Sequence, residues 1–98
     1  MKIVIENSPV SLALALRKIG YSFKRTDAET GEISATRALA RGGFPRFHIY
    51  AKIGNGALNL NLHLDQKRPS YAGGKAHSGE HESDAVKKES QRIEKILC

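Results

Sequence analysis

The chain has 98 residues, of which 40% are hydrophobic and 27% are charged, and its net charge is +6. These values predict one domain, residues 1–98, with a single core, and they argue against a generally disordered chain. No apolar stretch reaches the length of a membrane span, and the apolar run at residues 10–16 precedes its basic residues, unlike a secretory signal. We therefore expect a cytoplasmic protein with no membrane partner.

The positive charge is concentrated in the middle of the chain. Residues 37–75 contain seven lysines and arginines and one acid, Asp65, whereas both flanking segments are close to neutral. Such a segment is typical of proteins that bind polyanions, because each phosphate that is neutralised releases counterions. Basic residues also promote solubility, so charge alone leaves both interpretations open.

The N-terminal half predicts a strand, a helix and a pair of strands. Residues 2–5 are apolar and β-branched, as is typical of a strand. Ser8, followed by a proline, predicts the start of a helix that ends at Gly20. Alternating residues at 21–25 and again at 33–39, with a polar turn between them, predict two antiparallel strands whose register is open.

The clearest element is a hairpin at residues 47–64 with a Gly-Asn-Gly turn at 54–56. Apolar and polar residues alternate on both sides of the turn, which predicts one buried and one exposed face. Pairing Ile53 with Leu58 keeps the two apolar sets together. On the other face this register places Lys52 opposite Asn59, Tyr50 opposite Asn61, His48 opposite His63, and Arg46 opposite Asp65.

The C-terminal part predicts a loop and a helix. Residues 66–82 have no periodicity and predict a long loop, after which Ser83 predicts the cap of a last helix. The polar residues of this helix, among them Glu89 and Arg92, are expected on its solvated side. Together the elements predict an α+β fold in the order β-α-β-β-β-β-α, with two helices on one face of an antiparallel sheet.

The polar hairpin face and the basic loop contain residue types that suit a nucleic acid. Tyrosine and imidazole rings can stack on unpaired bases, while lysines and arginines contact phosphates. An exposed strand face is also polar merely because it is exposed. Our leading prediction is a small basic protein that binds RNA or another polyanion. The expected contacts are Arg41, Arg46, His48, Tyr50, Lys52, His63, Lys67, Arg68 and Lys75.

A metal site is an alternative that uses other members of the same segment. His63 and Asp65 lie two residues apart on one strand face, and His77 and His81 could complete the site from the loop. Imidazole and carboxylate ligands suit zinc. Under the leading prediction we expect no cofactor.

A ribonuclease is the other alternative, and a family resemblance supports it. Residues 16–25 look like the first helix and strand of the HicA-type mRNA interferase family, residues 47–50 are similar to its histidine strand, and residues 60–63 to the strand after it. The resemblance implies a dsRBD-like fold, metal-independent RNA cleavage with His48 as the catalytic residue, and an antitoxin-like protein partner. A histidine near an arginine can act as a general acid or base at a phosphodiester, and His63 is a second candidate for this role.

Overall fold

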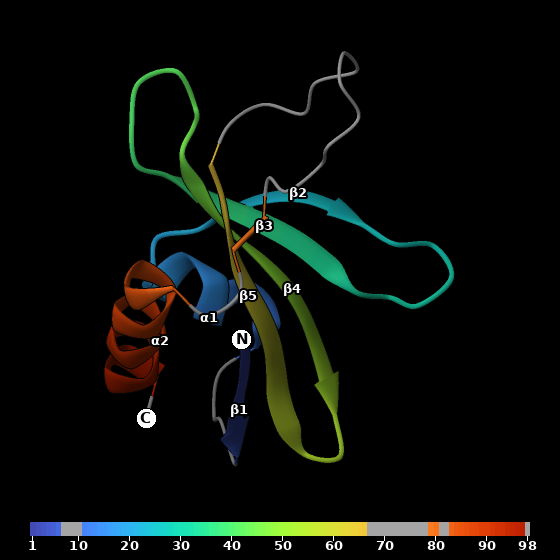
Figure 1. Ribbon diagram of the computed structural model, residues 1–98. Coiled ribbons are helices and arrows are strands. Elements are labelled where there is room, and N and C mark those ends of the chain that lie inside the picture. The colour runs from blue at the N-terminus through green and yellow to red at the C-terminus, as the bar shows by residue number, and fades with distance from the viewer. Residues whose placement is uncertain (7–10, 67–78, 81–82, 98) are drawn as a thin grey trace.

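The computed structural model describes residues 1–6, 11–66, 79–80 and 83–97 (Figure 1). In chain order its elements are β1 (Lys2–Glu6), α1 (Leu12–Lys18), β2 (Ser22–Thr26), β3 (Ile33–Ala38), β4 (Arg46–Gly54), β5 (Ala57–Asp65), β6 (Gly79–Glu80) and α2 (Asp84–Leu97). The predicted α+β class is confirmed. The short strand β6 was not predicted, because it lies in the segment expected to be a loop.

The strands form one antiparallel sheet in the order β1-β5-β4-β3-β2. The short strand β6 pairs with the last two residues of β5, Leu64 and Asp65, past the stretch that pairs with β1. The long β4–β5 hairpin occupies the centre of this order. Both helices lie on the same side of the sheet (Figure 1). The opposite side carries the polar face of the central hairpin; within the described residues no helix lies over it, and we term it the open side.

The register of β4 and β5 is the predicted one for every polar pair. The turn is tighter than predicted, because Gly54 also pairs with Ala57 and leaves only Asn55 and Gly56 between the strands. Both turn residues have positive φ, 56° and 73°. Asn-Gly is the sequence that tolerates this conformation best, so the turn chemistry fixes the register that the apolar pattern favours.

The core lies between the helices and the apolar face of the sheet. Alternate residues of β4 and β5 point into it, and the helices contribute one stripe each. The largest side chains that are completely buried are Ile19, Ile49, Leu58, Leu60, Leu62, Val86 and Ile93. No helix in the described ranges is long and apolar enough to cross a membrane.

The two helix starts differ in how well they were predicted. Ser11, not Ser8, caps α1, because its Oγ accepts a hydrogen bond from the Leu14 amide at 3.2 Å. The predicted start at Ser8 is therefore wrong, and Ser8 itself lies outside the described residues. The cap of α2 is confirmed: Ser83 Oγ accepts from the amide three residues later at 3.3 Å.

Glu89 was predicted to lie on the solvated side of α2, and this prediction is wrong. The residue is only 5% exposed and faces the sheet. It is part of the helix stripe that packs on the core, and its carboxylate is held there by basic and phenolic partners described below.

Candidate functional site

Polar side chains of β4 and β5 meet on the open side of the sheet. Arg46, His48 and Tyr50 come from β4, and His63 and Asp65 from β5, because alternate residues of paired strands point the same way. We term these five residues the histidine face. His48 and His63 are directly opposite each other, which confirms the pairing predicted from the sequence.

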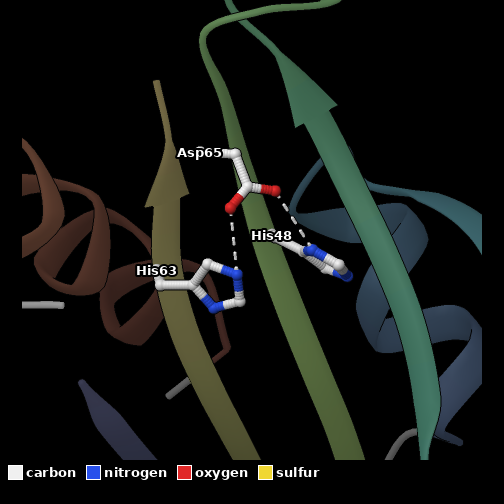
Figure 2. A group of neighbouring side chains, drawn as sticks. All are labelled: His48, His63 and Asp65. Carbon is white, nitrogen blue, oxygen red and sulfur yellow. Dashed lines mark hydrogen bonds and ion pairs between the residues drawn. The ribbon is translucent and has the colours of Figure 1, made fainter. Parts of the chain in front are cut away.

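Asp65 is the centre of the histidine face. Its Oδ2 accepts from Arg46 Nε at 3.2 Å and lies 3.3 Å from His48 Nδ1, while its Oδ1 lies 3.2 Å from His63 Nε2 (Figure 2). On its other side the Arg46 guanidinium lies over the Phe44 ring, 4.4 Å from the ring centre. One carboxylate therefore orients both imidazoles and the arginine.

Ser34 of β3 holds the far nitrogen of His48. Its Oγ lies 2.6 Å from His48 Nε2, and the residue is only 7% exposed. Since the Asp65 carboxylate can only accept, His48 Nδ1 must carry the proton that it donates to Asp65. In neutral His48 the Nε2 atom then accepts from the Ser34 hydroxyl. A chain Ser34–His48–Asp65 results, with every donor directed toward Asp65.

The ionisation of His48 is set by opposing influences. Burial lowers its pKa, Asp65 raises it through charge and hydrogen bonding, and Arg46 and Arg25 lower it again. The net effect is a pKa below the ordinary value of 6.5. His48 is therefore neutral at pH 7, in agreement with the hydrogen-bond chain that Ser34 completes.

Three rings lie side by side on the histidine face. The Tyr50 ring stacks on His48 with 4.5 Å between centroids and 30° between planes, and it lies 5.7 Å from His63. The two imidazoles are 4.9 Å apart. Their side chains keep 12% and 14% of their surface exposed, so the imidazoles are recessed but reachable from solvent.

A depression of about 180 Å³ adjoins the rings at Tyr50. It lies on the same side of the sheet, because β1 pairs with β5 and brings Lys2 opposite Asn61. Its polar lining residues are Lys2, Glu32, Tyr50, Lys52, Asn59 and Asn61. Tyr50 is thus shared between the histidine face and this depression.

The predicted nucleic-acid contacts fall into three groups. The structure brings together Arg46, His48, Tyr50, Lys52 and His63 on one side of the sheet. Arg41 is exposed in the β3–β4 connection. Lys67, Arg68 and Lys75 lie outside the described residues.

The basic segment is divided between the two sides of the sheet. Arg37 of β3 pairs with Glu89 on the helix side, with 3.4 Å between Nη1 and Oε1. Arg25 of β2, from outside the basic segment, is paired opposite Ser34 and joins the open side. The charge pattern along the chain therefore did not predict which basic residues share the open side of the sheet.

The residues of the predicted metal site are also divided. His63 and Asp65 lie together as predicted, while His77 and His81 lie outside the described residues. His48 takes a place beside them: one ligand atom from each of His48, His63 and Asp65 lies within 4.8 Å of the others. The sequence alternative did not include His48 in a metal site.

Ser34 was missed by the sequence analysis. The alternation of residues 33–39 indicated a strand, but no residue fixed its register, so the strand could not be placed beside β4. In the structure Ser34 is opposite Tyr50, which brings its hydroxyl to the neighbouring His48.

A catalytic role of His48 and His63 stays a prediction.

Known proteins give no further guide to the site. The chain matches no family model, no curated protein and no solved structure.

Proposed function

We propose that the histidine face binds single-stranded RNA. The observation that carries the proposal is the row of three rings, Tyr50 with His48 and His63, on the open side of an antiparallel sheet. Aromatic and imidazole rings on an accessible sheet are platforms on which unpaired bases stack, and each stacked base contributes about 1–3 kcal/mol.

Basic side chains lie on two sides of the row of rings, and one acid, Glu32, lies among them. Lys2 and Lys52 line the depression beside Tyr50, and Arg25 lies opposite Ser34 at the other side of the rings. Their spacing across the sheet suits a backbone that passes over the rings, because phosphates flank every stacked base. Arg46 is held by Asp65 and contributes less net charge.

The depression beside Tyr50 suits a base or a ribose. Asn61 supplies an amide group that can pair with a base edge or with a 2′-hydroxyl. Asn59 offers its side-chain oxygen, since its Nδ2 donates to the backbone oxygens of Gly54 and Ala57, and Lys52 supplies a cation at the rim. A nucleotide in the depression would extend the stack on Tyr50. This arrangement favours an unpaired strand over a duplex, whose bases are inaccessible to stacking.

The test is fluorescence anisotropy with a labelled single-stranded RNA oligonucleotide of mixed sequence. If Lys2, Arg25 and Lys52 each neutralise one phosphate, the logarithm of affinity falls with the logarithm of salt concentration with a slope of about −2. An affinity that does not weaken with salt would refute the proposal.

Variants of two aromatic residues, the partly exposed Tyr50 and the exposed Phe23, locate the binding surface. Tyr50→Ala should weaken binding about tenfold through loss of one stacked base, whereas Tyr50→Phe should retain most of the affinity. Phe23→Ala is the matched control: Phe23 is 60% exposed, but it pairs with Ala35 on the other side of the sheet. Equal losses for Tyr50→Ala and Phe23→Ala would contradict the proposed surface.

We also propose three finer features that accompany this function. They are the dsRBD-like description of the fold, cleavage of RNA by His48, and an antitoxin-like protein partner in the cytoplasm. The test for cleavage is a comparison of His48→Ala with the unaltered protein. If both cleave RNA at the same rate, His48 is not the catalytic residue.

A further inference from the structure

We propose that His48, His63 and Asp65 form a binding site for one divalent transition-metal ion, with zinc as the best fit. The site goes beyond RNA binding and stands or falls without it, since its tests contain no RNA. It also differs from the metal site predicted from the sequence, which required His77 and His81 and left His48 out.

The ligand atoms of His48, His63 and Asp65 lie close enough together to converge on one tetrahedral metal ion. Ligand atoms bonded to zinc at about 2.0–2.1 Å lie about 3.3 Å from one another. The nitrogen of His48 lies 3.3 Å from one oxygen of Asp65, and the nitrogen of His63 lies 3.2 Å from the other. All three ligand atoms lie within 4.8 Å of each other, so small side-chain rotations place an ion between them (Figure 2).

Strand pairing holds the three ligands in place. His48 and His63 are directly opposite on β4 and β5, and Asp65 is the next residue of β5 on the same face. Ligands on paired strands at the centre of a sheet are positioned by the backbone hydrogen bonds, which reduces the ordering cost of binding an ion. A site assembled from a loop has no such support.

Ser34 supplies the outer contact that a metal-bound imidazole requires. A histidine that binds metal through one nitrogen almost always donates its other N–H to an oxygen. Ser34 Oγ lies 2.6 Å from His48 Nε2 and can accept that proton. On binding, neutral His48 changes tautomer: solvent takes the proton from Nδ1, which becomes the metal ligand, and returns one to Nε2. The Ser34 hydroxyl then turns its hydrogen away and accepts from Nε2–H. The metal-free and metal-bound proteins therefore hold opposite tautomers of His48.

The ligand set selects the class of metal. Two imidazoles and one carboxylate suit zinc and similar borderline ions rather than calcium or magnesium, which prefer oxygen ligands alone. Three protein ligands leave a fourth position, and the ligand side chains retain 12–15% exposure on the open side of the sheet. An ion there would present that position to solvent or to a phosphate oxygen.

Isothermal titration of the untagged, metal-free protein with zinc chloride tests the site. We expect one ion per chain. His48→Ala, His63→Ala and Asp65→Asn should each weaken binding by more than about 100-fold, and Ser34→Ala by about tenfold, the usual effect of an outer contact. Gln91→Ala, at an exposed position of α2, is the control and should bind zinc like the unaltered protein. Full affinity in any of the three ligand variants overturns the proposal.

A second measurement uses the unaltered protein and does not depend on the folding of variants. Long-range ¹H–¹⁵N spectra of the imidazoles report which nitrogen of His48 carries the proton. We expect Nδ1–H before zinc and Nε2–H after one equivalent, with the His63 signals shifting at the same stoichiometry. Zinc that binds without altering the spectra of both histidines overturns the site.

Discussion

Two carboxylates on opposite sides of the sheet gather partners in different ways. Glu89, on the helix side, has a side chain only 4% exposed, whereas that of Asp65, on the open side, is 15% exposed. The partners of Glu89 are a phenol and two arginines, which remain donors at physiological pH. Two of the partners of Asp65 are histidines, which can lose a proton and change role. The first cluster fixes the fold, and the second can exchange its contacts for a ligand.

The Glu89 cluster connects distant parts of the chain. Tyr21 donates to it at 2.6 Å and Arg92 at 2.8 and 2.9 Å, while Arg37 lies 3.4 Å away. Arg92 also donates to the backbone oxygen of Ile19 at 2.6 Å, at the end of α1. This single group of contacts therefore ties α2 to α1, to the start of β2 and to β3.

The largest expected difference between the clusters is in stability. Glu89→Gln leaves two arginines without their anion and should lower the free energy of unfolding by about 3 kcal/mol, the lower end for a buried pair because both arginines are partly exposed. Asp65→Asn should cost less, about 1.5 kcal/mol, because its one arginine partner is partly exposed and its other partners are imidazoles. Urea denaturation measures both. Equal losses would mean that Asp65 is as structural as Glu89.

A smaller expected difference is in the acid dependence of stability. Burial alone would raise the pKa of Glu89, but hydrogen bonds from Arg92 and Tyr21, and the charges of Arg37 and Arg92, outweigh it and hold the pKa below 4.5. A folded-state pKa below the unfolded value gives stability that is fully present above about pH 4.5 and is lost as the pH falls through the folded pKa.

The comparison of unaltered protein with Glu89→Gln isolates this effect. The pKa of Asp27 is also lowered, by hydrogen bonds from the Thr30 and Glu29 amides, but that contribution is the same in both proteins. In thermal melts between neutral and acidic pH, the stability difference between the two should shrink as the pH falls. A difference that stays constant would exclude the proposed role of Glu89.

The sequence predicted the open cluster better than the closed one. Strict alternation and the Asn-Gly turn set the hairpin register, and from it followed the meeting of His48, His63 and Asp65. Ser34 escaped prediction because its strand had no register anchor. The interior position of Glu89 escaped because the residue is charged, although it lies three residues after Val86 and four before Ile93 on the buried stripe. That spacing indicates a buried position. The arrangement of Tyr21, Arg37 and Arg92 around the carboxylate explains why a charged residue can occupy it.

We conclude that the open side of the sheet is functional and that the Glu89 side is structural. Backbone ¹H–¹⁵N spectra of the protein titrated with a mixed-sequence single-stranded RNA oligonucleotide test it most directly. We expect the largest shifts at the amides around His48, Tyr50 and His63 in β4 and β5, with those around Glu89 in α2 nearly unchanged. Shifts that centre on α2, with β4 and β5 unaffected, would contradict it.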